Sequence, residues 1–370
     1  MNVSSFIIIL TNSKYMKKSL IINLILMTFV MTSCHNSEKY ENTSLFSFSD
    51  FKTTEMLNAT QIEFDEPIML PLLFVKSDSL LIIQNLKSIN MLYVYNVNSR
   101  KKVGEFISWG SGPDDFLAIK NLQLVGSDLY ISDIQKRAIV KYDINDFHKL
   151  SKNLMPIQKI EIEDFFSNLV YTDNGYVATT MNSDKNRLIF FDSKGEKMFT
   201  AGDYPYFGKE LTAIEKIEGY VSQIAISHKY ERIFLFGMVT DLIEIYDFQG
   251  NLIKRFHGPE QIFPQIKEMH LPNGYSQGAY DNPTFTFFTP MIIDDEIYVS
   301  YSGNHQKPDD TVPYIRQIFV FDIDCTPRRR YELSEPIVSF TVDPVTKNIY
   351  ATSNDPEYHM VIFQIQRIVR

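Results

Sequence analysis

The chain has 370 residues, with 36 Lys and Arg against 45 Asp and Glu, which gives a formal net charge of −9. Hydrophobic residues make up 44% and charged residues 22%, a balance that excludes an intrinsically disordered chain. The negative charge argues against nucleic-acid binding, because such a protein needs a basic face to neutralise phosphates. The 28 Phe and 21 Tyr favour β-structure, where aromatic side chains fit a pleated, half-buried surface.

The first predicted element is a secretory signal peptide. Lys17 and Lys18 precede a short apolar run at 20–31, and small residues follow. The apolar run is shorter than the roughly 20 residues that span a bilayer. Met16 stands directly before the lysine pair, so we predict that translation starts there and that residues 1–15 come from a misplaced upstream start.

Residues 31–34, Met-Thr-Ser-Cys, resemble a bacterial lipobox, with Met31 where Leu is usual. The resemblance implies that 1–33 is a lipoprotein signal peptide and that Cys34 carries acyl chains such as palmitate, which hold the protein to the membrane. The alternative is an ordinary signal peptide with a chance cysteine. If Cys34 is lipidated, Cys325 has no partner, which excludes a disulfide framework. We expect an outer-membrane lipoprotein that faces the periplasm or the exterior, with a flexible polar tether at 34–44.

Residues 45–370 show a repeated pattern of short strands. Its clearest markers are aromatic strands that end at 96, 143, 192, 247, 322 and 364, a spacing of 42 to 55 residues with one step of 75. Each marker follows another apolar strand, at 79–83, 128–132, 175–178, 231–235, 296–299 and 348–351. A period near 40–50 residues made of four short strands is typical of a β-propeller blade. The pattern therefore predicts an all-β fold, a six-bladed β-propeller.

The sixth unit stops too early to supply its own outer strand, and a closed ring leaves no strand edge unpaired. We predict that the last blade is closed by an N-terminal strand near 59–64. Helical patterns are scarce: residues 157–168 could hold one short turn, and 208–217 fit a brief amphipathic helix. Alternating β and α units are absent, which argues against a parallel nucleotide-binding sheet.

Residues 109–116, Trp-Gly-Ser-Gly-Pro-Asp-Asp-Phe, resemble the Gly-x-Gly-Pro-x-Glu-Phe loop of six-bladed propeller lipoproteins from Bacteroidales, which are similar to TolB-like and NHL propellers. Residues 128–143 also look like an NHL-type blade, whereas Asp115 departs from the usual Glu. The resemblance implies fold and envelope location, because most members have no assigned activity. From the residues themselves, we expect the glycines to permit a tight reversal and Phe116 to plug between blades.

Signatures of the common hydrolase, zinc and redox sites are missing, and the seven histidines lack ligand spacing, so we assign neither a metal nor a cofactor. Two long excursions, 257–290 and 302–314, are the candidate binding regions, because long loops in compact domains are usually functional or mobile. Aromatic side chains on such loops can anchor a protein, a peptide or a glycan, or they can pack onto their own blade. The candidate residues are Phe263, His270, Tyr275, Tyr280, Phe285, Phe287, Phe288 and His305.

Asp309 and Asp310 beside His305 are either cation ligands or a solvated loop tip. The leading functional interpretation is a non-catalytic binding or scaffold module of the cell envelope, expected to be monomeric. The alternatives are a propeller enzyme of lactonase or lyase type, with its site in the funnel around the axis, and a substrate-capture protein of a transport system. The first alternative requires acidic, amide or imidazole groups that converge on the central channel.

Overall fold

The structure is a computed structural model that describes residues 39–66, 68, 70–86, 88–149, 154–181, 186–272, 274–280, 282–305 and 315–365. The predicted signal peptide, Cys34, Asp309 and Asp310 lie outside these residues. Asn42–Arg370 form one compact unit. Among the described residues, no helix is long and apolar enough to cross a membrane.

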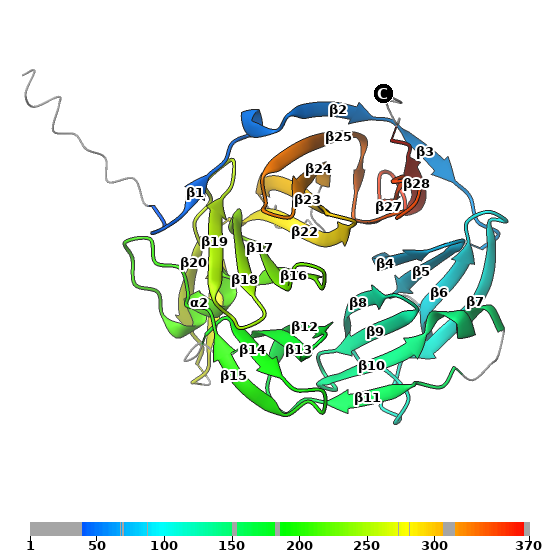
Figure 1. Cartoon of the computed structure of the whole chain (residues 1–370), viewed down its shortest axis with the longest axis horizontal. Coiled ribbons are helices and arrows are strands. Elements are labelled where there is room, and N and C mark those ends of the chain that lie inside the picture. Colours follow the sequence, from blue (N-terminus) through cyan, green and yellow to red (C-terminus); the bar gives the residue numbers. More distant parts are fainter. Residues whose placement is uncertain are drawn as a thin grey trace, which may run out of the picture. The chain divides into compact units, whose positions relative to one another are not determined.

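Six antiparallel sheets form a ring, and in each sheet the strands follow one another outward from the axis (Figure 1). Blade 1 contains β4 (Pro71–Ser77), β5 (Leu80–Asn85), β6 (Asn90–Asn96) and β7 (Lys101–Ser108). Blade 2 contains β8 (Ile119–Val125), β9 (Asp128–Asp133), β10 (Ala138–Asp143) and β11 (Gln158–Glu161). Blade 3 contains β12 (Phe166–Thr172), β13 (Gly175–Thr180), β14 (Leu188–Phe191) and β15 (Lys197–Ala201).

Blades 4 to 6 repeat this order. Blade 4 contains β16 (Ser222–Ser227), β17 (Arg232–Gly237), β18 (Leu242–Asp247) and β19 (Leu252–His257). Blade 5 contains β22 (Thr284–Ile293), β23 (Glu296–His305), β24 (Ile315–Asp322) and β25 (Pro327–Ile337). Blade 6 contains β26 (Ser339–Val342), β27 (Ile349–Ser353) and β28 (His359–Phe363). The predicted aromatic strands are the third strands β6, β10, β14, β18, β24 and β28, which confirms the six-bladed propeller.

The core lies between the blades. Six clusters of buried apolar side chains occupy the six interfaces between adjacent blades. The second strands are therefore covered on both faces, and every residue of β5 and β13 is buried. This double burial explains why these strands are nearly continuous apolar runs instead of alternating ones.

The N-terminal segment forms a belt along the rim of three blades, drawn in blue in Figure 1. β1 (Ser44–Leu45) pairs in parallel with β19, and β2 (Thr53–Leu57) pairs in parallel with β25. β3 (Ala59–Ile62) pairs antiparallel with β28 and supplies the fourth strand of blade 6, which confirms the predicted closure. Between β1 and β2, the ring of Phe51 lies 4.7 Å from that of Phe319, at the interface of blades 4 and 5.

The two helical predictions have different outcomes. Residues 213–219 form α2 (Ala213–Gly219), which overlaps the amphipathic stretch at 208–217, and Thr212 and Glu215 make a reciprocal capping box at its first turn. The helical turn predicted at 157–168 is wrong, because 158–161 form β11, which pairs with β10, and 166–168 begin β12. The remaining helical turns are η1 (Phe48–Asp50) and η2 (Ile144–Lys149).

The loop between blades 1 and 2 is organised by Asp115. Its carboxylate accepts a hydrogen bond from the backbone N–H of Gly112 at 3.0 Å. A Cβ atom at Gly110 or Gly112 would lie 2.5 or 2.7 Å from this carboxylate oxygen, so a side chain at either position would displace the carboxylate. Phe116 is buried in the cluster between blades 1 and 2, as expected for a plug.

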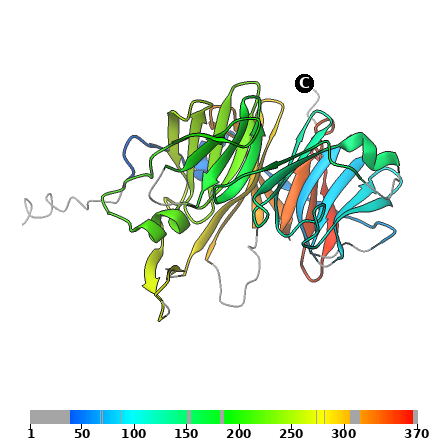
Figure 2. The same cartoon turned by 90° about the horizontal axis from the view of Figure 1, so that it is seen from below.

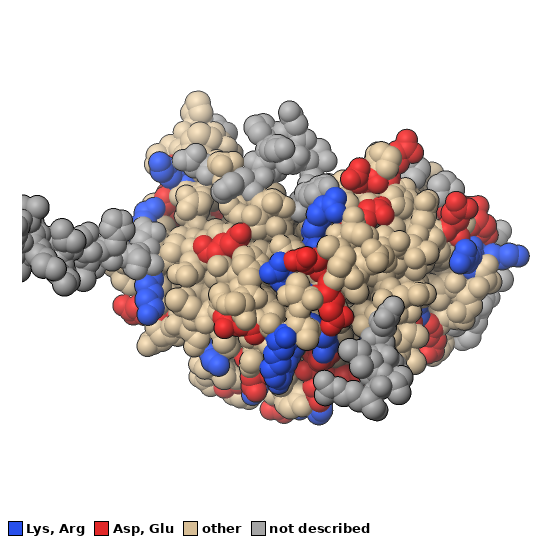
Figure 3. All heavy atoms as spheres, turned by 90° about the horizontal axis from the view of Figure 1, so that it is seen from above, with Lys and Arg blue, Asp and Glu red and all other residues tan. Residues whose placement is uncertain are grey.

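Acidic and basic side chains alternate on the rim that carries β2 and β25, as Figure 3 shows. Three arginines there are each within ion-pair distance of a carboxylate. The pairs are Arg328 with Asp322, Arg329 with Glu296, and Arg330 with Glu332. This part of the surface therefore presents mixed charge and no continuous basic stripe.

Candidate ligand-binding site

The long connections gather at one end of the blades. Because adjacent strands run antiparallel, the connections that enter each blade lie at the same end as the turns between its second and third strands. We call this end the loop face and the opposite end the turn face. α2 and the hairpin of β20 (Ile266–His270) and β21 (Ser276–Tyr280) belong to these connections, and they project to one side of the ring (Figure 2).

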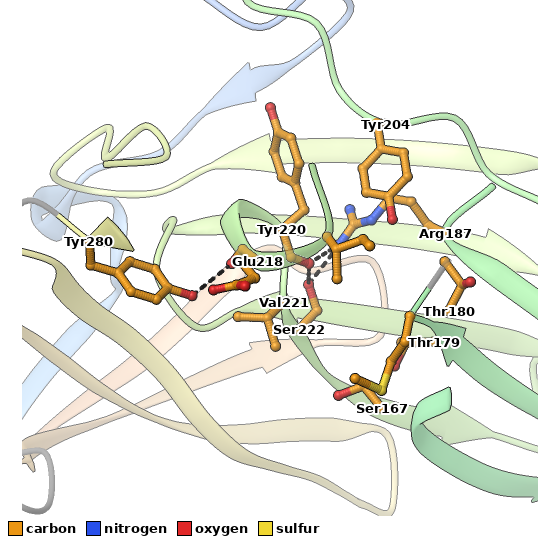
Figure 4. Close-up of a pocket in the computed structure, with 12 residues that line it drawn as sticks. Ser167, Thr179, Thr180, Arg187, Tyr204, Glu218, Tyr220, Val221, Ser222 and Tyr280 are labelled. Carbon is orange, nitrogen blue, oxygen red and sulfur yellow. Dashed lines mark hydrogen bonds between the residues drawn. The ribbon is translucent and has the colours of Figure 1, made fainter. Parts of the chain in front are cut away.

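A pocket of about 150 Å³ lies on the loop face between blades 3 and 4, and we call it the blade 3–4 pocket (Figure 4). Its lining comes from β12, β13, β16, α2, β21 and the connections between them. Seven lining residues carry a hydroxyl group: Ser167, Thr179, Thr180, Tyr204, Tyr220, Ser222 and Tyr280. Arg187 and Glu218 are the charged residues among the lining. Most polar groups of the lining are therefore neutral, and the hydroxyls of Tyr220, Ser222 and Tyr280 already make hydrogen bonds within the protein.

Arg187, which lines the pocket, belongs to a buried ion network with Glu244 and Arg255. Glu244, whose side chain is fully buried, accepts from Arg255 Nε at 2.8 Å through Oε1 and pairs with Arg187 through Oε2. The other guanidinium nitrogen of Arg187, Nη2, donates to the Tyr220 carbonyl at 2.9 Å and to Ser222 Oγ at 2.7 Å. Buried charges persist only when they are paired and hydrogen-bonded. Arg187 is thus already compensated by protein groups, and it holds the two sides of the pocket together.

The hairpin and α2 close the pocket on the other side. Glu218 Oε1 accepts from the backbone N–H of Gly278 at 3.1 Å, and Tyr280 Oη donates to the Glu218 carbonyl at 3.2 Å. Burial and the nearby Glu218 carboxylate raise the pKa of Tyr280 to about 12, so its hydroxyl stays protonated at neutral pH. A Cβ at Gly278 would lie 2.4 Å from Ile266 Cδ1, which explains glycine at this close crossing. The hairpin is therefore docked on α2 by specific contacts.

The sequence-predicted site residues of the hairpin are accessible. Tyr280 lines the pocket and is 40% exposed, and Tyr275, at 72% exposed, lies at the hairpin turn. His270 is exposed, and its Nδ1 lies 2.8 Å from Ser276 Oγ on the paired strand. Phe263 is half-buried, with its ring centroid 5.0 Å from that of Phe207. These four residues lie on or beside the long connection, as expected.

The remaining predicted site residues belong to blade 5 and not to a loop. Phe285, Phe287 and Phe288 are part of β22, and Phe287 is fully buried against Phe236 and Tyr301 in the core. Phe287 is therefore a packing residue, and the prediction that it contacts a ligand is wrong. Phe285 and Phe288 are half-buried and pack on each other at 5.7 Å. His305 ends β23, where its backbone pairs with Thr284.

Asp241 holds the start of the long connection between β19 and β22, residues 258–283. Its carboxylate accepts from the backbone N–H groups of Glu260 at 2.9 Å and Ile262 at 2.7 Å, and it lies 3.1 Å from His257 Nε2. Asp241 and His257 are almost completely buried, so this pair acts on the loop and not on solvent. Across the described ranges, no group of three or more His, Cys, Asp or Glu side chains is arranged to hold a metal ion.

Sequence reasoning missed Arg187, Tyr204 and Tyr220, which lie outside the two excursions. Arg187 directly precedes the apolar strand β14, and nothing in that pattern indicates that its partner is Glu244 on the next blade. One local signal exists for Tyr204. Residues 202–207, Gly-Asp-Tyr-Pro-Tyr-Phe, follow the last strand of blade 3 as Gly110 to Phe116 follow that of blade 1, so the same kind of inter-blade connection recurs.

Six blades of four antiparallel strands each, the last one closed by a strand from the start of the body, define a six-bladed β-propeller. The chain belongs to the TolB-like six-bladed propeller family, whose model, described as TolB-like 6-blade propeller-like, matches residues 47–344. No curated protein matches the chain.

Two solved structures from Bacteroides are similar over most of the chain. A candidate exported protein from Bacteroides fragilis is 13% identical with a TM-score of 0.53, and the match covers 88% of this chain and 100% of that one. A member of the DUF4221 family from Bacteroides vulgatus is 8% identical with a TM-score of 0.50, over 84% and 96% of the two chains. These likenesses show a shared fold, and they confirm the expected resemblance to Bacteroidales six-bladed propellers.

Proposed function

We propose that this protein is a non-catalytic binding module of the cell envelope, and that the blade 3–4 pocket holds a neutral, hydroxyl-rich ligand such as a short glycan. The observation that carries the proposal is the lining of the pocket: seven hydroxyl-bearing residues around an arginine whose charge Glu244 already compensates. Neutral hydroxyls donate and accept hydrogen bonds, which suits a ligand with the same groups. A ligand anion would gain less there, because Arg187 is engaged in the buried network.

The hairpin adds an aromatic surface beside these hydroxyls. Tyr280 lines the pocket, and Tyr275 is exposed at the turn of the same hairpin. Tyrosine offers a large rigid contact area at low conformational-entropy cost, and its flat ring packs well against a sugar. Docking of the hairpin on α2 through Glu218 keeps this surface in place before a ligand arrives, which reduces the ordering cost of binding.

Titration calorimetry with short neutral malto-, cello- and manno-oligosaccharides tests the proposed ligand class. Tyr280→Ala should weaken binding of the oligosaccharide that binds best by about tenfold, the effect of losing one good aromatic contact of about 1.4 kcal/mol. Tyr230→Ala is the matched control, because Tyr230 has a similar exposure of 37% but lies on the turn face between β16 and β17. Equal loss in both variants, or binding of unstructured peptides in place of every sugar, would contradict the proposal.

The proposed location rests on the N-terminal pattern and has its own test. Cys34, in the Met-Thr-Ser-Cys motif, should incorporate an alkyne-labelled palmitate in cells, and the protein should then remain in the membrane fraction. Cys34→Ser should abolish both the label and the membrane retention. Mapping of the precursor N-terminus by mass spectrometry checks whether translation starts at Met16. A labelled Cys34→Ser variant would point to another acylation site.

A further inference from the structure

The axis of the ring contains a second region of cavities, apart from the blade 3–4 pocket. The innermost strands leave two chambers of about 400 and 330 Å³, which share lining residues including Phe74, Asn121 and Met291. The larger is lined by the first residues of β4, β8 and β16, so it lies toward the loop face, and we call it the loop-face chamber. Its volume falls within the roughly 300–1,000 Å³ typical of ligand pockets.

Lys120 is the one charged residue among the described residues that line the loop-face chamber. Within the described ranges, its ammonium has neither a hydrogen bond nor an ion pair. Burial lowers the pKa of Lys120, and no nearby charge counteracts this effect. In the other chamber, by contrast, Lys76 pairs with Asp343 at 3.0 Å. An uncompensated, partly desolvated cation is costly, and an anion that binds beside it recovers part of that cost.

Amide groups beside Lys120 supply additional hydrogen-bonding capacity. Asn121 Oδ1 is buried without a hydrogen-bond partner among the described residues. Gln84, only 2% exposed, reaches the Ile119 carbonyl with a long 3.4 Å contact from Nε2. Asn121 Oδ1 is an acceptor, so it can take a donor hydrogen but does not pair with a carboxylate oxygen. For an anionic head group near Lys120, the donors that these amides offer are their N–H groups, such as Gln84 Nε2.

The rest of the chamber wall is apolar and includes a strained residue. Leu72, Phe288, Met291 and Val338 contribute hydrocarbon surface. Thr289, between two of them, has a φ of 49°, where β-branched residues are seldom found, and it lies at the register shift between β22 and β23. Strained backbone that the surrounding structure holds in place is frequently associated with ligand sites. The wall therefore combines one cationic group with a large apolar surface.

We infer that the loop-face chamber binds an organic monoanion with an apolar body, a carboxylate whose head group pairs with Lys120 and whose hydrocarbon part contacts Phe288 and Met291. The inference goes beyond the proposed glycan binding, because it concerns a different cavity and an anionic instead of a neutral ligand. Either site can fail without affecting the other.

Titration calorimetry with octanoate and with its neutral analogue octanamide tests the assignment on the intact ring. Octanoate should bind the wild-type protein, and Lys120→Met should weaken it by about tenfold or more, as expected for loss of a charge-assisted contact. Octanamide should bind both proteins equally. Lys120→Arg should retain octanoate binding, because it preserves the charge.

Lys194→Met is the matched control, because Lys194 is exposed at the turn between β14 and β15, far along the blade from the axis. Lys120→Met should also raise the melting temperature of the ligand-free protein, whereas a lysine with a purely structural role would lower it. If Lys120→Met does not fold, Lys120→Gln serves as the neutral variant. Absence of octanoate binding to the wild type at millimolar concentration, or unchanged binding after the charge is removed, would overturn the inference.

Discussion

The blade 3–4 pocket and the loop-face chamber open on the same face of the ring but treat their cations differently. Arg187 is held by Glu244 and by backbone and hydroxyl acceptors, whereas Lys120 has no acceptor among the described residues. A buried cation that is paired can hold neighbouring elements together, whereas an unpaired buried cation gains free energy when an anion binds beside it. The two cavities therefore differ in how their cations are paired, although both lie toward the loop face.

Deletion of residues 45–65 should have the largest effect, because both cavities require a closed ring. The deletion removes β1, β2 and β3, leaves β28 with an unpaired edge, and takes Phe46 and Phe51 out of the blade 4–5 interface. We expect loss of the cooperative thermal transition in circular dichroism. A chain that begins at residue 42 is the control, and a truncated chain with an unchanged melting temperature would contradict the role of the belt.

Glu244→Gln should have the next largest effect and tests the compensated side of the comparison. It leaves Arg187 and Arg255 buried without their shared carboxylate, which typically costs about 3–5 kcal/mol of unfolding free energy. Chemical denaturation measures the loss, with the exposed residue change Glu231→Gln as control. A loss below about 1 kcal/mol would mean that the network contributes little, and Arg187 would then be open to a ligand anion.

The pair of Lys76 and Asp343 predicts a dependence of stability on pH. Burial of the Asp343 carboxylate opposes its ionisation, but the Thr346 backbone N–H and Lys76 outweigh this and hold its pKa below the ordinary 3.8. A carboxyl with a depressed folded-state pKa stabilises above the unfolded value, and this contribution is lost as the pH falls through the folded pKa. Denaturation from pH 6 to pH 2 should show a decline below about pH 4 that is smaller in Asp343→Asn.

The smallest expected effect concerns an exposed pair on the turn face. Lys229 Nζ lies 2.8 Å from Asp295 on the neighbouring blade, but both side chains are well exposed to solvent. Solvent screens such pairs, and side-chain entropy offsets their attraction. Lys229→Ala should therefore leave the melting temperature unchanged within error at physiological salt. A clear decrease would show that ion pairs between blades stabilise this ring even without burial.

The repeat could be predicted because its cause is local. Each third strand is a short aromatic run that ends in Asp, Asn or Gln, and turns such as 247–251, with Gly250 at a φ of 83°, follow from adjacent residues. The closing strand at 59–62 was also predictable, because the last repeat visibly lacks one strand. The failure at 157–168 has the opposite cause: the isolated pattern was ambiguous, and pairing with β10 made it β11.

The candidate site residues were predicted less well. The length of a loop indicates that it is not part of the regular blade, but it does not indicate which of its side chains line a cavity. Tyr280 was found in this way, but Phe287, from the same aromatic stretch, is core. The sequence by itself determined the number of blades and the order of their strands, because each strand is a short apolar run bounded by turn residues, and this pattern repeats along the chain. Only the tertiary structure decided which charges meet: Glu244 reaches Arg187 across a blade interface, and Lys120 faces the axis without an acid among the described lining residues. Such pairings depend on distances between residues far apart in the chain.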